Sequence, residues 1–151
     1  MEKTAKVTHS GFSLIELLIV IGILAIISAI GVSGFSMAQK RARDAGRKSD
    51  LAQFRSSLES YANNNNGLYL THATVVNADT ICGASDLNLG FSCPVDVKSA
   101  TSPYGYKYIS DASATRYALY AYLEVTSNYW AMCSNGNTLS KATAPVVADC
   151  P

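Results

Sequence analysis

One uncharged stretch near the N-terminus constrains the fold of this chain more than any other feature. "GFSLIELLIVIGILAIISAIGV" covers Gly11 to Val32, and its only ionisable side chain is Glu16. The 22 residues from Leu17 to Ala38 carry no charge. At about 1.5 Å per residue, a helix of that length crosses the roughly 30 Å hydrocarbon core of a bilayer. We therefore expect a membrane-spanning helix over residues 12–38, and the presence of Glu16 in it needs an explanation.

Two other interpretations of this stretch are weaker. A secretory signal peptide has a shorter apolar region, about 7 to 15 residues, followed by a small-residue cleavage site. The sequence pattern alone leaves open a signal-peptidase cleavage near "SAIGVSG". Such a cleavage would release a soluble secreted domain beginning near Phe35. A buried core helix is less expected, because the rest of the chain is too small to surround it.

Composition restricts the remainder of the molecule. With 151 residues, 48% hydrophobic and 15% charged, the chain suits one membrane segment and one small globular domain. The net charge is +1 and the charges are dispersed, so the overall charge gives no reason to expect nucleic-acid or membrane-lipid partners. The only histidines are His9 and His72, which form no base and nucleophile pattern. We expect no enzyme and assign no catalytic residue.

The helix is expected to continue beyond the membrane. Apolar residues recur at spacings of three and four at Leu51, Phe54, Leu58 and Tyr61. The run "NNNNG" at 63–67 then supplies residues that end helices. The pattern predicts one helix over about 12–63, with residues 39–66 as its amphipathic continuation.

Beyond Gly67 the sequence predicts strands. "YGYKYIS" (104–110), "RYALYAYLEV" (116–125) and "YWAMC" (129–133) contain the two-residue alternation of β-strands. Their short polar connections favour a three-stranded antiparallel sheet, with one face covered by the apolar helix stripe. Residues 68–103 read as an irregular connecting loop. The predicted fold class is α+β: a long N-terminal helix, transmembrane in its first half, packed on a C-terminal three-stranded antiparallel sheet.

The cysteines indicate disulfide bonds, and the acids do not indicate a metal centre. Cys82, Cys93, Cys133 and Cys150 include no CxxC pair, so two disulfides in an oxidising compartment fit best. Pairing of sequence neighbours gives Cys82 with Cys93 and Cys133 with Cys150; two other pairings remain open. The aspartates lack the dense oxygen-ligand run of a calcium site, so we assign no metal and no cofactor; those considered are Asp86, Asp96, Asp111 and Asp149.

The "GFSLIE" segment resembles a known targeting signal. A short basic leader ending in Gly11, then Phe12, Glu16 and an unbroken apolar helix, is similar to the class III signal sequence of type IV pilins and type II secretion pseudopilins. The resemblance implies that prepilin peptidase removes leader 1–11 between Gly11 and Phe12 and that Phe12 is N-methylated. It also implies a structural subunit that polymerises through its N-terminal helix, with a globular head over 67–151.

This resemblance gives Glu16 a role. An ionised acid at membrane depth costs about 2.5 to 3.5 kcal/mol on insertion scales, so it should persist only with a partner. Cleavage creates an amine on Phe12, one helical turn from Glu16. In a filament the partner can instead be the amine of a neighbouring subunit, which makes Glu16 the expected assembly residue.

Partners and location follow from the same resemblance. The implied partners are copies of the chain itself, prepilin peptidase and the inner-membrane pilus assembly machinery. The implied location is the cytoplasmic membrane before assembly and an extracellular or periplasmic filament afterwards, with the head outside the cytoplasm. The alternatives are a major pseudopilin of a type II secretion system and a membrane-anchored extracytoplasmic binding domain that does not polymerise.

Two features depart from the family pattern. Many type IV pilins have a proline where this chain has Ser33, between Gly31 and Gly34. Because Gly and Ser pairs also mark kinks, we expect local melting there in a filament. The second departure is electrostatic.

Just after the span the cations outnumber the acids by three; they are Lys40, Arg41, Arg43, Arg47 and Lys48 against Asp44 and Asp50. The positive-inside rule taken alone would place this segment in the cytoplasm, whereas the expected disulfides require the opposite side.

Overall fold

The computed structural model describes residues 11–82, 87 and 93–151. The rest of the predicted leader, residues 1–10, lies outside these ranges. Contacts divide the chain into two compact units, and the boundary between them in the sequence falls between Ala38 and Gln39. The structure confirms the α+β class: one long helix is followed by an antiparallel sheet.

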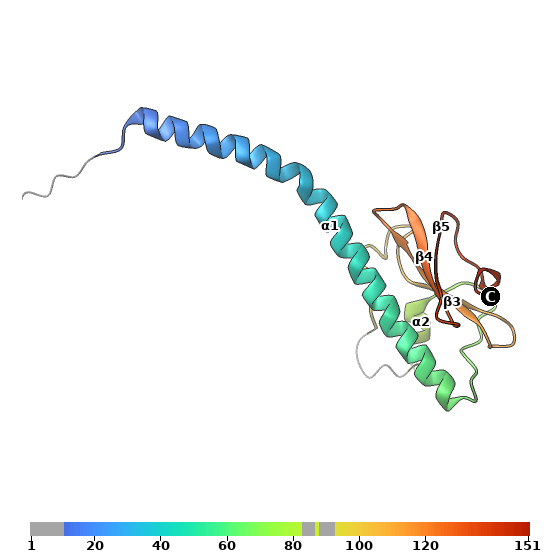
Figure 1. Cartoon of the computed structure of the whole chain (residues 1–151). Helices are drawn as coiled ribbons and strands as arrows, with labels where there is room; N and C mark the ends of the chain where they lie inside the picture. The colour runs from blue at the N-terminus through green and yellow to red at the C-terminus, as the bar shows by residue number, and fades with distance from the viewer. Residues whose placement is uncertain (1–10, 83–86, 88–92) are drawn as a thin grey trace, which may run out of the picture. The chain divides into compact units, whose positions relative to one another are not determined.

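Helix α1 spans Leu14–Asn64, 51 residues without interruption (Figure 1). It is the one helix among the described residues that is long and apolar enough to cross a membrane. In the first unit, every described side chain from Leu14 to Ala38 is exposed. An exposed apolar surface of this kind is more stable in contact with lipid or with other helices than in contact with water. The backbone is helical through Gly31–Gly34 in this single chain, so the melting expected in a filament stays a prediction.

The second half of α1 carries the apolar stripe that the sequence predicted. Leu51, Phe54 and Leu58 are fully buried in the main hydrophobic core of the head. After Asn64 the chain turns through Gly67, whose positive φ of 80° favours glycine. The Gly67 N–H bonds to the carbonyl of Ala62 at 2.8 Å, so this turn caps the helix.

The sheet has five strands in the order β1-β2-β3-β4-β5, and every neighbouring pair is antiparallel. The bounds are β1 Val76–Asn77, β2 Lys107–Ser110, β3 Tyr117–Leu123, β4 Asn128–Cys133 and β5 Thr138–Lys141. The three predicted strands correspond to β2, β3 and β4. The predicted count of three was wrong because two short edge strands extend the sheet on either side.

The extra elements carry little sequence signal. Strand β1 has two residues and is followed by a short helix, α2 Ala78–Cys82, so the predicted loop over 68–103 is partly structured. Strand β5 reads "TLSK" and is mostly exposed, without an apolar alternation. A 3-10 turn, η1 Val147–Asp149, closes the chain.

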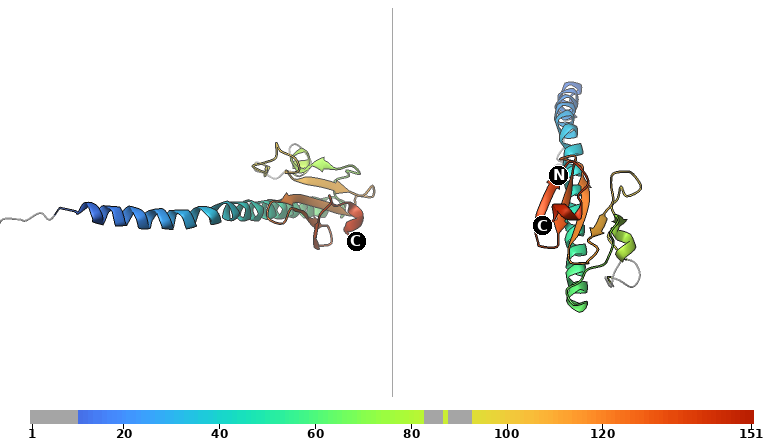
Figure 2. Two further views of the ribbon diagram at one scale, coloured as in Figure 1. Left: turned by 90° about the horizontal axis from the view of Figure 1, so that it is seen from above. Right: turned by 90° about the vertical axis from the view of Figure 1, so that its right-hand side faces the viewer.

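Both faces of the sheet are covered. Tyr108, Leu119 and Met132 lie in register across β2, β3 and β4 and pack in the same core as the second half of α1. The two views in Figure 2 show that half of α1 running beside the sheet. On the opposite face, Ala118 and Cys133 pack with Cys150. Strand β3 is therefore almost wholly buried, which explains its apolar and aromatic composition.

Candidate functional site

The start of α1 is exposed and capped by a serine. Gly11 and Phe12 precede the helix, and both are exposed. The Ser13 hydroxyl accepts a long hydrogen bond of 3.4 Å from the Ile15 N–H. The Ser13 carbonyl accepts the N–H of Leu17 at 3.2 Å. Ser13 is thus the N-cap of α1, and the Gly11–Phe12 bond lies just outside the helix in an exposed segment.

Glu16 occupies the third helical position after this cap. Helical side chains tilt toward the N-terminus, so its carboxylate is directed to the end of the helix that carries partial positive charge. Glu16 is exposed, and within the described residues no ion pair joins its carboxylate to another side chain. The sequence analysis missed Ser13, although Ser13 and Glu16 together form the S-x-x-E pattern of a capping box.

A cluster of paired charged side chains lies in the head unit. Arg43 binds Glu124 through two hydrogen bonds of 2.7 Å each. Arg47 binds Asp96 at 2.6 and 3.2 Å, Asp44 at 2.7 Å and Glu124 at 2.9 Å. The Arg47 side chain is only 2% exposed, so three carboxylates satisfy a guanidinium that solvent does not reach.

Further contacts extend this cluster to the backbone. The Asp44 carboxylate accepts the N–H groups of Glu124 and Val125, each at 2.9 Å. The Lys98 ammonium donates to Glu124 at 2.7 Å. We call these six residues the charged cluster: Arg43, Asp44, Arg47, Asp96, Lys98 and Glu124. It fastens α1 to the segment that follows Cys93 and to the turn between β3 and β4.

Two acids of the charged cluster, Glu124 and Asp96, have lowered pKa values. The hydrogen bond from Arg43 is the main cause that holds the pKa of Glu124 far below its usual range. Burial alone would raise the pKa of Asp96, but the hydrogen bond from Arg47 and the backbone N–H of Lys98 outweigh it, so that pKa is also lowered. Because every member faces a partner of opposite charge, the cluster suits structural fastening rather than proton transfer.

The comparison with protein families matches residues 8–32 to the prokaryotic N-terminal methylation motif. The chain carries a prokaryotic N-terminal methylation motif. This motif is the class III signal sequence of type IV pilins and pseudopilins. No curated protein and no solved structure matches the chain significantly.

The methylation motif contains the residues that the sequence analysis singled out: Gly11, Phe12 and Glu16 fall inside it. It supports a precursor of the type IV pilin or pseudopilin kind, and it implies processing by prepilin peptidase and assembly into pilus-type filaments. The apolar first half of α1 fits membrane insertion before assembly.

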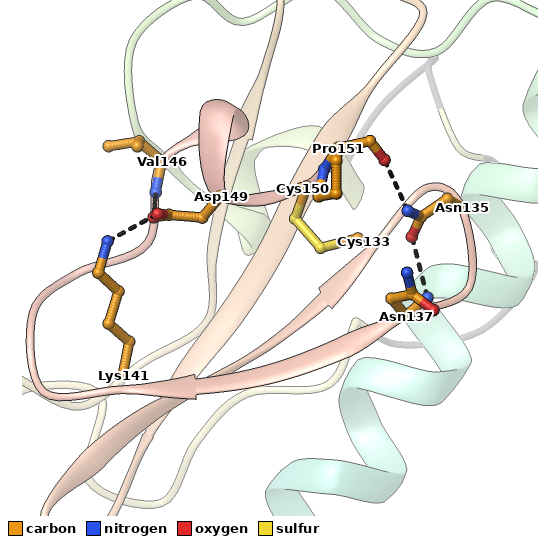
Figure 3. Close-up of a disulfide and its surroundings, with 8 residues drawn as sticks. All are labelled: Cys133, Asn135, Asn137, Lys141, Val146, Asp149, Cys150 and Pro151. Carbon is orange, nitrogen blue, oxygen red and sulfur yellow. Dashed lines mark hydrogen bonds and ion pairs between the residues drawn. A yellow bond between two sulfur atoms is a disulfide. The ribbon is translucent and has the colours of Figure 1, made fainter.

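Two cysteine pairs staple the head. Cys82 bonds Cys93 across 11 residues, and Cys133 bonds Cys150 across 17. Figure 3 shows the second bond and its surroundings. There Lys141 binds Asp149 at 2.7 Å, and the Asn135 amide donates to the Pro151 carbonyl at 2.6 Å. These contacts hold the C-terminal segment against β4 and β5.

The acids considered as metal ligands are engaged otherwise. Asp96 belongs to the charged cluster, Asp111 accepts from Thr115, and Asp149 binds Lys141. Asp86 lies outside the described residues. In the part of the chain that the structure describes, no group of three or more His, Cys, Asp or Glu side chains is placed to hold a metal ion.

Proposed function

We propose that this chain is a structural subunit of a type IV pilus or pilus-like filament. Prepilin peptidase cuts it between Gly11 and Phe12, Phe12 is N-methylated, and the mature chain polymerises through α1. The observation that carries the proposal is the methylation motif at residues 8–32, placed directly at the start of an exposed apolar helix. The exposed Gly11–Phe12 junction supports cleavage at that bond.

Glu16 acts in assembly through the amine that cleavage creates. Ser13 caps the helix, so the new amine on Phe12 lies one residue beyond the cap and Glu16 lies three residues inside it. An acid and an amine so placed can neutralise each other in the separate subunit. In a filament the Glu16 carboxylate instead pairs with the Phe12 amine of an adjacent subunit. Because an unpaired charge in an apolar core is costly, this pairing sets the register of neighbouring subunits.

The head folds outside the cytoplasm. Two disulfides support this location, because such bonds persist in oxidising compartments. The charged cluster and the C-terminal staple give this small head the rigidity that a filament's outer layer needs.

The decisive experiment is a mass measurement of the N-terminal peptide of the chain expressed with a prepilin peptidase. The expected peptide begins with Phe12 and carries one added methyl group. A peptide that still begins with Met1, or one that begins near Phe35, would overturn the proposal. The matched control is Gly11→Val, at a position where the structure is open and unstrained; this variant should keep its leader.

A membrane-anchored binding domain that does not polymerise is the competing function. It also predicts a membrane-inserted chain, so insertion does not distinguish the two. Negative-stain microscopy of sheared cell-surface material does: filaments that contain this chain support the proposal, and a processed chain that stays monomeric in the membrane supports the competitor.

A further inference from the structure

A groove of about 260 Å³ lies on the sheet face opposite α1, wholly within the head unit. Side chains alternate along β3, so Tyr120 and Tyr122 share the face of Ala118, which packs on the side away from α1. Lys107 of β2 pairs in register with Tyr120, and Tyr129 of β4 pairs with Tyr122. Three strands thus supply the groove with one side chain each: Lys107, Tyr120 and Tyr129.

The segment that precedes β2 forms one side of this groove. Ser99, Ser102 and Tyr104 line it from that segment. The Tyr104 ring lies edge-on to the ring of Tyr122, with 5.7 Å between the centroids. The guanidinium carbon of Arg47 lies 4.8 Å from the Tyr104 centroid. Because the charged cluster fixes Arg47, the Tyr104 ring is held in place without a ligand, which lowers the entropy cost of binding one.

An almost buried hydroxyl opens on the groove. Tyr120 is only 3% exposed, and its hydroxyl makes no hydrogen bond to another described residue. In the described part of the chain, no buried side-chain oxygen or nitrogen lacks a partner, so this hydroxyl must reach the open space of the groove. Burial raises the pKa of Tyr120 above its usual value of about 10, and the hydroxyl therefore stays a donor at neutral pH. A ligand in the groove can accept this hydrogen bond.

The charge of the groove is positive. Lys107 donates one hydrogen bond to the Asn77 side chain, and its ammonium group has two further protons to donate. Among the described residues, no acid lines the groove. The site therefore favours a ligand with a negative group near Lys107.

Size and lining restrict the class of ligand. A volume of 260 Å³ is below the range of about 300 to 1,000 Å³ that drug-sized ligands occupy, so it suits one ring. Single-stranded nucleic acid needs a basic groove that follows several phosphates, which one lysine does not provide. An apolar side chain of a partner protein would leave the tyrosine and serine hydroxyls without hydrogen bonds, at a cost in free energy. A sugar suits both kinds of lining, because its C–H groups pack on aromatic rings and its hydroxyls pair with hydroxyls.

We propose that this groove binds one acidic sugar residue of a glycan chain, a pyranose that carries a carboxylate. The carboxylate pairs with Lys107, a ring hydroxyl accepts from Tyr120, and the ring packs between Tyr104 and Tyr129. The outer rim is exposed at Ser99, Ser102 and Ala144, so a residue linked into a glycan can enter. The inference goes beyond the proposed function and does not depend on it, because every residue used belongs to the head.

The test is a titration of the full chain in micelles of a detergent without a sugar headgroup, followed by nuclear magnetic resonance of isotope-labelled tyrosine rings. The probe is methyl β-glucuronide, and the matched neutral sugar is methyl β-glucoside. A ligand of this size is expected to bind with a dissociation constant on the order of 1 mM, so the titration extends to about 20 mM. The glucuronide should shift the ring signals of Tyr104, Tyr120 and Tyr129. Tyr117, which faces α1 and binds Glu59, should not shift.

Two pairs of variants make the test specific. Lys107→Gln should weaken glucuronide binding about tenfold or more and remove the preference over the glucoside. Lys48→Gln, which removes an exposed lysine on the α1 side, should leave it unchanged. Tyr120→Phe keeps the ring and should weaken binding of both sugars about two- to tenfold, as expected for one neutral hydrogen bond. Tyr117→Phe removes a hydroxyl from the opposite face of β3 and should have no effect on binding.

The other outcomes overturn the proposal. Absence of shifts at the three groove tyrosines refutes the site. Equal affinity for the glucuronide and the glucoside refutes the role of Lys107. Equal shifts with sodium acetate show that the groove holds a bare anion rather than a sugar. None of these results changes the mass expected for the peptide that begins at Phe12, so failure of this inference is distinguishable from failure of the proposed function.

Discussion

Replacing Arg47 by methionine should destabilise the head by about 3 kcal/mol. Arg47 makes four hydrogen bonds to three carboxylates. Charged hydrogen bonds contribute about 1.5 to 3 kcal/mol each, but those of one network do not add. The cost is set by what remains unpaired, and removing one partner of a buried ion pair costs about 3 to 5 kcal/mol.

The structure places the effect near the lower end of that range. Without Arg47, Glu124 keeps Arg43 and Lys98. Asp44 keeps its two backbone N–H donors. Asp44 loses its cation as well, but these two donors still satisfy its carboxylate. Asp96, whose side chain is 3% exposed, loses its cation and is left with backbone N–H contacts alone, the Lys98 N–H at 2.8 Å among them. One stranded carboxylate, rather than three, accounts for the expected magnitude.

The assay is denaturant unfolding of the full chain in detergent micelles, followed by fluorescence of Trp130. Trp130 is the only tryptophan; it packs against the main core, and Lys48 lies 5.3 Å above its ring. Arg116→Met is the matched control, because Arg116 is 49% exposed and lies 3.6 Å from Asp111. An exposed pair of this kind contributes less than about 1 kcal/mol.

A second substitution tests the cause. If the cost comes from the stranded charge, adding Asp96→Asn to Arg47→Met should cost less than the two single changes together, by about 0.5 to 3 kcal/mol. The reasoning is refuted if Arg47→Met costs no more than Arg116→Met, or if the two changes at the cluster simply add.

Three further predictions concern other parts of the chain. Glu16→Ala should leave cleavage and insertion intact while sharply reducing the yield of sheared filaments; a normal yield would contradict the pairing with the Phe12 amine. Changing both Cys133 and Cys150 to serine should lower the unfolding free energy by about 3 kcal/mol in the Trp130 assay, because this bond closes a loop of 17 residues; an unchanged midpoint would contradict a stabilising staple. The pKa of Glu124 is lowered in the folded head, so the contribution of Glu124 to the unfolding free energy is complete above its unfolded pKa of about 4.3 and is lost as the pH falls below that value. The denaturant midpoint of unfolding should therefore stay constant from about pH 7 to 5 and fall below about pH 4. In Glu124→Gln this fall should be less steep.

The sequence predicted the elements whose periodicity is strong. The stripe of Leu51, Phe54 and Leu58 located the packed face of α1, and tyrosine and leucine alternation located β2, β3 and β4 within a few residues. These patterns arise from burial on one side of an element, which repeats at a fixed spacing in the sequence. Gly11, Phe12 and Glu16 lie in the contiguous methylation motif, which a sequence pattern can locate, and their roles in processing and assembly stay predictions.

The elements that the sequence did not reveal depend on contacts distant in the chain. Strand β1 exists because Val76 and Asn77 pair with residues of β2 about 30 positions later. The charged cluster joins Arg47 to Asp96 across 49 residues and Arg43 to Glu124 across 81. Each member taken alone resembles an ordinary solvated charge, so no local pattern indicates that these side chains are buried together.

The charged cluster also changes the meaning of the positive charges that follow the membrane span. The positive-inside rule counts charges in the unfolded chain near the span, where Arg43 and Arg47 both oppose translocation. Once the head has folded, these two arginines are bound to Glu124 and Asp96. On the proposed topology, returning the segment through the membrane would require breaking buried ion pairs as well as unfolding a disulfide-stapled head. Folding therefore turns Arg43 and Arg47 from free cations of the unfolded segment into ion-pair partners of the head, so their effect on translocation and their role in the folded head are separate.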